Sequence, residues 1–411
     1  MNILMLVQIF ETPADNGSDR HYFFAKELAK KGNRLKVITS NIDYKKASKR
    51  FDTLKPVSKW YSGVEVLYAP VFSMFRGSYF KRVIFYLSFI FSSFIELMKS
   101  SKTSDLIYGV SPPLTVPLVC AIVAKFRKLP FVLEVCDVWP DAAVHSGVLK
   151  NKIVIWVARK IEIFCYKNAA HIVCLTEGIE KNIIEKGISS SKISVVTNGV
   201  DLELFTTVES VKTSRIKSSL GLDNKFVAMY LGAHGKYNAL GTIIESAKNL
   251  RDDKNIMFFF VGDGEEKAKL KTMVSEENLA NVLFHESVNR VNAVEILSVA
   301  DCFLLPNLAG DFFKVNLPNK LFDFLASGRP VIVSGHVESA VLVKKINAGF
   351  VLDAEDPMQL SKSIEAVYSM PAGERRKLGE NGAVYVRSHY DRKMHVNQLS
   401  DIFTRVLHDV K

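Results

Sequence analysis

Short apolar stretches alternate with stretches of helical period along almost the whole chain, and this alternation constrains the fold more than any other feature. Residues 3–7 are apolar, residues 18–31 have the period of a helix, and residues 35–39 are apolar again. Such alternation is typical of parallel sheets with helices on both faces. The remaining predicted strands of this first series are 106–108, 131–135, 172–175 and 194–197.

A second series of apolar stretches predicts a second sheet of the same kind. Its predicted strands are 226–231, 256–261, 282–284, 302–305, 331–333 and 350–352. The turn sequence Asn198-Gly199-Val200-Asp201 ends the first series, and a chain of 411 residues suits two cores better than one. We therefore predict an α/β protein with two doubly wound, Rossmann-like domains, 1–202 and 203–391. Ligands of such folds bind at the carboxyl ends of the strands, so we expect a cleft between the domains.

Charge and cysteine content narrow the classes of partner. The net charge of +11 favours a negatively charged partner, and the candidates are nucleic acid, anionic lipid and a nucleotide diphosphate. A basic surface that only keeps the protein soluble is the alternative. Nucleic acid ranks last, because the sequence has no RRM signature, zinc finger or arginine-rich tail. The five cysteines form no CxxC motif, which argues against structural zinc and disulfides and fits a reducing cytoplasm.

The segment 318–333 carries the strongest candidate site. Pro318 suits a first helical position, and Gly328 suits the residue just past the helix end. Lys320, Asp323 and Ser327 share one stripe of the predicted helix, opposite an apolar side. A lysine and a carboxylate near a helix N-terminus suit the phosphates and ribose of a nucleotide. The alternative is a surface ion pair worth a few tenths of a kcal/mol.

This segment resembles the donor site of retaining GT-B glycosyltransferases of family four, in the branch that assembles bacterial surface polysaccharides such as O-antigen and capsule. The shared pattern is a proline-started helix with a lysine, an acidic residue and then Ala-x-Gly-x-Pro-Val. The resemblance implies that domain 203–391 binds a nucleotide sugar, that domain 1–202 binds the acceptor, and that helix 392–411 packs back on the first domain. It also implies that Asp323 binds the ribose, so that Asp323→Ala weakens nucleotide binding and leaves the fold intact.

One departure from the family pattern leaves a role open. Many members carry a glutamate where this chain has Val315. Its polar neighbours Lys314, Asn316 and Asn319 are the candidates to replace it, and we include Asn319 with Lys320 among the donor-binding residues.

The loop after the second domain's first strand is a further donor-binding candidate. In the family an arginine and a lysine of this loop hold the diphosphate, but the aligned residues here are Ala233 and Asn238. We predict that His234 and Lys236 take their place. The loop lacks the leading glycine and the Ser/Thr of a Walker A motif.

Two loops of the first domain are predicted to face the cleft. Gly17, Ser18 and Arg20 open a helix after the first strand, where free N–H groups suit an anion, and the resemblance places them near the donor diphosphate or the acceptor. An ordinary turn capped by Ser18 is the alternative.

Asp137 lies in an Asp-x-Trp-Pro segment that the resemblance places on the acceptor side. It is our catalytic candidate, because a carboxylate at a strand end can orient a hydroxyl. Capping of a turn is the alternative for Asp137 as well.

The apolar stretch 83–98 is unusual because it contains four phenylalanines and is flanked by Lys81, Arg82, Lys99 and Lys102. It is shorter than the roughly 20 residues that span a bilayer. A buried helix is the first interpretation, and a peripheral membrane contact is the alternative.

Together these observations predict a glycosyltransferase of the EC 2.4 class. We expect that a sugar is transferred from a UDP-sugar to a lipid-linked glycan in lipopolysaccharide or polysaccharide biosynthesis. An N-acetylated sugar is the expected donor. The acceptor would be polyprenyl-diphosphate-linked, and the enzyme cytoplasmic or peripheral on the inner membrane. No Asp-x-Asp pair is present, so neither a metal nor another cofactor is expected. The alternatives are a sugar-nucleotide epimerase of the same fold and a non-catalytic sugar-nucleotide-binding protein.

Overall fold

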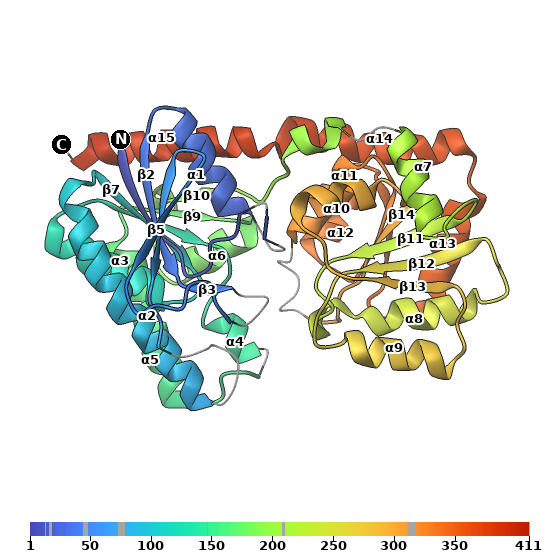
Figure 1. Cartoon of the computed structure of the whole chain (residues 1–411), viewed down its shortest axis with the longest axis horizontal. Coiled ribbons are helices and arrows are strands. Elements are labelled where there is room, and N and C mark those ends of the chain that lie inside the picture. Colours follow the sequence, from blue (N-terminus) through green and yellow to red (C-terminus); the bar gives the residue numbers. More distant parts are fainter. Residues whose placement is uncertain are drawn as a thin grey trace. The chain divides into compact units, whose positions relative to one another are not determined.

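The chain forms two compact units in a computed structural model, which describes all residues except 13, 16–18, 44–47, 73–78, 146, 208–209, 311–316 and 411. One unit comprises Met1–Thr12, Ser18–Thr197 and His395–Lys411, and the other comprises Pro13–Gly17 and Asn198–Met394. Each is an α/β unit around one main sheet with helices on both faces (Figure 1).

The sheet of the first unit has eight strands. They are β1 (Asn2–Leu6), β2 (Arg34–Ser40), β5 (Val57–Tyr61), β6 (Val64–Ala69), β7 (Leu106–Ser111), β8 (Phe131–Val135), β9 (His171–Cys174) and β10 (Ile193–Val195). Their spatial order is β10-β9-β8-β7-β1-β2-β6-β5, and all neighbours are parallel except β5 and β6. The short strands β3 (Ile42–Asp43) and β4 (Ser48–Lys49) form a separate antiparallel pair.

Helices cover both faces of this sheet. One face carries α1 (Arg20–Lys30) and α15 (Arg392–Val410). The other carries α2 (Tyr79–Ser100), α3 (Thr115–Arg127), α5 (Lys152–Asn168) and α6 (Glu177–Glu185). Between β8 and α5 lies the short helix α4 (Asp141–His145), and 3-10 turns occur at Ser101–Thr103 and Ser190–Lys192. Because α1 follows β1 and α3 follows β7 on opposite faces, the crevice between these neighbouring strands is a topological switch point.

The sheet of the second unit has six strands, and all of its neighbouring pairs are parallel. They are β11 (Phe226–Leu231), β12 (Ile256–Val261), β13 (Val282–His285), β14 (Cys302–Leu305), β15 (Val331–Ser334) and β16 (Gly349–Leu352), in the order β13-β12-β11-β14-β15-β16. The face with α8 (Leu240–Asn249), α9 (Lys267–Glu276) and α13 (Pro357–Ser369) lies opposite the face with α10 (Arg290–Leu297), α11 (Asn319–Ala326), α12 (Glu338–Lys345) and α14 (Ala372–His389). The described part of this unit also contains two 3-10 turns, η3 (Leu202–Thr207) and η4 (Lys236–Asn238), and the helix α7 (Ser210–Ser219).

The switch point of the second unit lies between β11 and β14. The helices that follow these neighbouring strands, α8 and α11, pack on opposite faces of the sheet. This separation opens a crevice at the carboxyl ends of the two strands, which is where ligands of doubly wound sheets bind. The loop that carries η4 and the N-terminus of α11 both begin at this edge.

The predicted α/β class is confirmed, and the structure adds a hairpin that the predicted strands lack. The antiparallel pair β5–β6 is joined by Ser62 and Gly63, both with positive φ. The helix at 318–333 also differs in one detail: Pro318 is the N-cap, with extended backbone, and α11 begins at Asn319. Gly328 follows the helix end with φ +68, as predicted for a C-terminal glycine.

The apolar segment predicted at 83–98 belongs to α2, one side of which is packed on the first sheet. Phe85, Phe89 and Leu97 are at most 2% exposed. The segment Val83–Thr103 is long and apolar enough to cross a membrane by composition, and 39% of its most apolar window is buried. Spanning would require this packed side to leave the core, so α2 is part of the fold.

Candidate donor and acceptor sites

Lys320 lies at the switch point of the second unit, near the N-terminus of α11. Its ammonium group donates hydrogen bonds to the Tyr230 hydroxyl at 2.8 Å and to Asn238 Oδ1 at 3.1 Å, and it lies 4.5 Å from the centre of the Tyr230 ring. These partners are neutral. Burial lowers the pKa of Lys320 to about 7. Within the part of the chain that the structure describes, no carboxylate bonds this ammonium group, and a cation enclosed at a helix N-terminus is suited to an anionic ligand.

Glycines allow the loops after β11 and β12 to approach each other at this edge. A Cβ on Gly262 would lie 1.9 Å from the carbonyl oxygen of Gly232, and a Cβ on Gly264 would lie 2.5 Å from that of His234. A Cβ on Gly232 would lie 3.0 Å from Lys320 Nζ. Larger residues would therefore push the loops apart and fill the space beside the lysine, which explains why Gly232, Gly262 and Gly264 are glycines.

Asp323 lies one turn further along α11 and is engaged by an arginine that the sequence reasoning missed. Arg290, the first residue of α10, donates from Nη1 and Nη2 to the two carboxylate oxygens, both at 2.6 Å. Asp323 is only 6% exposed. The pair fixes the carboxylate beside the predicted ribose position. It also changes the expectation that Asp323→Ala leaves the fold intact, because that variant would remove a carboxylate that holds a nearly buried guanidinium through two hydrogen bonds.

His234 is part of the loop between β11 and η4, and its side chain is fully buried. Its ring lies 5.9 to 6.3 Å, between ring centres, from Tyr230, Phe260 and Phe284, and neither ring nitrogen has a hydrogen-bond partner among the residues that the structure describes. Burial, reinforced by the charge of Lys267, lowers the pKa of His234 to about 4. A neutral imidazole offers no charge to a diphosphate, so the charge must come from lysines.

The remaining predicted donor residues are placed as follows. Lys236 is exposed on η4, the turn that also carries Asn238. Asn319 is the first residue of α11, and its buried Oδ1 has no hydrogen-bond partner in the described part of the chain. Gly17 and Ser18 lie outside the described residues, as do 314–316. The structure therefore brings Lys320, Asp323 and Asn319 together on α11 beside the loop that holds Lys236.

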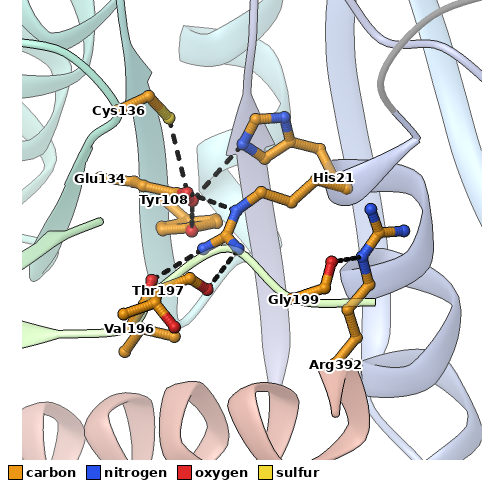
Figure 2. Close-up of polar contacts among 9 residues, drawn as sticks. His21, Tyr108, Glu134, Cys136, Val196, Thr197, Gly199 and Arg392 are labelled. Atoms are coloured by element: carbon orange, nitrogen blue, oxygen red, sulfur yellow. Dashed lines mark hydrogen bonds and ion pairs between the residues drawn. The ribbon is translucent and has the colours of Figure 1, made fainter. Parts of the chain in front are cut away.

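Arg20 is buried in the first unit, where its side chain joins three segments of the chain. Figure 2 labels its partners Glu134, Val196 and Thr197. Arg20 is 2% exposed; its Nε donates to Glu134 at 3.0 Å, and its other two nitrogens donate to the carbonyl oxygens of Thr197 and Val196. All three nitrogens are thus used to join α1, β8 and the segment after β10. This pairing occupies the guanidinium of Arg20 in the described structure, and its placement near the donor diphosphate or the acceptor stays a prediction.

Glu134 is the centre of this cluster. It is fully buried, accepts a short hydrogen bond from the Tyr108 hydroxyl and lies 3.5 Å from His21 Nε2. Burial alone would raise the pKa of Glu134, but the charges of Arg20 and His21 hold it well below its usual range. His21, Glu134 and Cys136 are the one His/Cys/carboxylate group among the described residues close enough to hold a metal. The carboxylate already neutralises an arginine, which does not suit a metal site.

Asp137 follows Cys136 in the loop after β8. Its Oδ1 accepts a hydrogen bond from the N–H of Val138 at 2.8 Å, and its side chain is partly buried. Burial raises the pKa of Asp137, and the hydrogen bond from Val138 opposes that shift. The carboxylate lies in the loop at a strand end, where a substrate hydroxyl can meet it.

Comparison with known proteins gives this architecture a family. The description "Glycosyltransferase Family 4" matches residues 20–204, and "Glycosyl transferases group 1" matches residues 212–384. The chain belongs to glycosyltransferase family four. This family-four enzyme has a GT-B-like fold, with one matched segment in each unit.

Three similar proteins illustrate the relationship. The WcaI protein of Escherichia coli K12, provisionally named a colanic acid biosynthesis glycosyl transferase, is 28% identical over 75% of this chain and 76% of its own. An E. coli UDP-Gal:α-D-GlcNAc-diphosphoundecaprenol α-1,3-galactosyltransferase is 32% identical over 50% of this chain and 53% of its own. The structure of Anabaena HepE in complex with UDP and glucose superposes with a TM-score of 0.74 at 15% identity, covering 98% of this chain and 99% of HepE. The enzyme is therefore a glycosyltransferase of surface-polysaccharide biosynthesis.

Proposed function

We propose that this enzyme transfers a sugar from a UDP-sugar to a hydroxyl group of a lipid-linked glycan, with retention of anomeric configuration. The observation that carries the proposal is the position of Lys320, a cation enclosed beside a glycine loop at the switch point of the second unit. N-acetylated sugars are the first donors to test. The polyprenyl-diphosphate acceptor would meet the enzyme at the cytoplasmic face of the membrane.

The charge and shape of the second unit support a nucleoside diphosphate as the donor group. In the proposed complex Lys320 exchanges its bonds to Tyr230 and Asn238 for oxygens of the diphosphate, and Lys236 adds a second charge from η4. Asp323, oriented by Arg290, accepts hydrogen bonds from the ribose hydroxyls. Preformed charges at the leaving group stabilise the transition state, in which negative charge develops on the departing phosphate.

Relatives support the choice of UDP and of a lipid-linked acceptor. HepE is solved with UDP and glucose, and the E. coli galactosyltransferase is named for a UDP-Gal donor and a diphosphoundecaprenol acceptor. On the acceptor side, Asp137 would orient the attacking hydroxyl. Its raised pKa makes it a better proton acceptor than an ordinary aspartate.

The test is release of free UDP from a panel of UDP- and GDP-sugars, with and without a polyprenyl-diphosphate-linked acceptor. We expect one UDP-sugar to release UDP only when the acceptor is present. Asp137→Asn should lower this turnover while leaving the affinity for UDP unchanged. A preference for GDP-sugars, or a changed sugar still attached to UDP, would contradict the proposal.

A further inference from the structure

The outer sides of α2, α3 and α5 form one exposed apolar surface on the first unit. Figure 1 shows the three helices side by side on one face of the sheet, and residues from all three enter the same core cluster beneath. Six large apolar side chains on their outer sides are between 44 and 74% exposed: Leu87, Phe91, Ile122, Phe126, Ile153 and Trp156. Exposed aromatic residues in such density on one face mark a binding surface.

A groove of about 330 Å³ runs between α3 and α5 within this surface. Leu118 and Ile122 line it from α3, and Trp156, Ile161 and Phe164 line it from α5. The ammonium of Lys160 lies 5.7 Å from the centre of the Trp156 ring. An aromatic ring with a basic side chain beside it is the arrangement that membrane interfaces favour.

The exposed charges of the three helices are all basic. Their sequences contain two acidic residues, Glu96 and Glu162, and both are buried and paired, with Lys99 and Lys186 respectively. The exposed basic residues are Lys81, Lys99, Lys125, Lys128, Lys152, Arg159, Lys160 and Lys167. The surface therefore combines apolar side chains with a positive rim.

We propose that this surface docks the enzyme on an anionic lipid bilayer, with the aromatic rings in the interface and the lysines at the headgroups. The charge complementarity selects this occupant. A symmetric dimer through the same surface would bring two positive rims together, in a chain of net charge +11. The link between docking and a lipid-linked acceptor rests on the proposed function; the docking itself does not.

Vesicle co-sedimentation of the full chain tests the docking without donor or acceptor. We expect binding to vesicles that contain phosphatidylglycerol and much weaker binding to phosphatidylcholine alone. The double variant Phe126→Ser/Trp156→Ser should lose at least about tenfold in affinity, since two large apolar groups no longer enter the lipid. The double variant Lys152→Gln/Lys160→Gln should lose roughly 30-fold on anionic vesicles only.

Trp60 supplies the matched control, because it is 65% exposed on β5, outside this surface. Trp60→Ser should bind vesicles as the wild type does. Brominated lipids should quench the tryptophan fluorescence of Trp60→Phe, which keeps Trp156. They should quench the fluorescence of Trp156→Phe, which keeps Trp60, much less. Equal vesicle binding by all variants would overturn the proposal. So would a wild type that does not bind vesicles and instead forms a dimer through this surface. Normal UDP release with a water-soluble acceptor in a non-binding variant would show that the transferase proposal stands separately.

Discussion

Lys320 should make UDP binding depend on pH in the range where few other groups titrate. Burial lowers its pKa to about 7 in the free enzyme, whereas a bound diphosphate would stabilise the charged form and raise its pKa. Binding must therefore protonate the lysine once the pH exceeds about 7. The cost is about 0.4 kcal/mol at pH 7 and about 2.7 kcal/mol at pH 9, so the dissociation constant of UDP should rise roughly 50-fold between these values.

Isothermal titration calorimetry measures both the affinity and the protons taken up. The phosphate groups of UDP are fully ionised above pH 7, because a phosphate ester has its second pKa near 6. At pH 8 the binding of one UDP should take up about 0.9 proton, read from titrations in two buffers that differ in ionisation enthalpy. The sign is fixed: affinity falls as the pH rises.

Two lysine variants separate this reasoning from a general charge effect. Lys320→Met should bind UDP weakly at every pH, take up no proton at pH 8, and unfold at no lower temperature than the wild type, because an enclosed ammonium costs free energy. Lys236→Met removes an exposed lysine of the same loop region and should keep the pH dependence. A constant affinity between pH 7 and 9 in the wild type would refute the assignment of Lys320.

Three further predictions test the surroundings of the two sites. Arg290→Met should lower the free energy of unfolding by about 3 kcal/mol, because Asp323 would stay buried without its partner, and the added change Asp323→Leu should recover most of that loss in urea unfolding. Gly262→Ala should weaken UDP binding in a thermal-shift titration, because its Cβ would meet the carbonyl oxygen of Gly232 in the loop after β11. Glu134→Gln should destabilise the chain by about 3 kcal/mol at neutral pH, measured by urea unfolding. The pKa of Glu134 is lowered in the folded state, so its contribution is present above about pH 4.3 and is lost in stronger acid, where variant and wild type should converge.

The fold could be predicted from sequence wherever a strand is buried on both faces. Such strands are short apolar runs, and the six predicted in the second unit are the six strands of its sheet. The β5–β6 hairpin is different, because β5 is an edge strand on which both Lys59 and Trp60 are exposed. Its signal was the Ser62-Gly63 pair, a two-residue hairpin turn, between two short stretches that contain valines and aromatic residues.

The candidate site could be predicted only as far as local spacing reaches. Helical period alone placed Lys320 and Asp323 on one stripe of α11. Arg290, which holds Asp323, comes from another helix 33 residues earlier, and no local pattern identifies such a partner. Arg20 lies at a helix start that could bind an anion, but its guanidinium is paired with the buried Glu134, which is more than 100 residues later in the sequence. Tertiary pairing decides which charges remain for a ligand.

The central claim is that Lys320 binds the diphosphate of the donor at the switch point of the second unit. A crystal structure of the enzyme with UDP tests it most directly. The account predicts that Lys320 Nζ leaves the Tyr230 hydroxyl and bonds a phosphate oxygen, with the ribose hydroxyls on Asp323. A bound UDP whose phosphates lie away from Lys320, with the lysine still bonded to Tyr230 and Asn238, would contradict it.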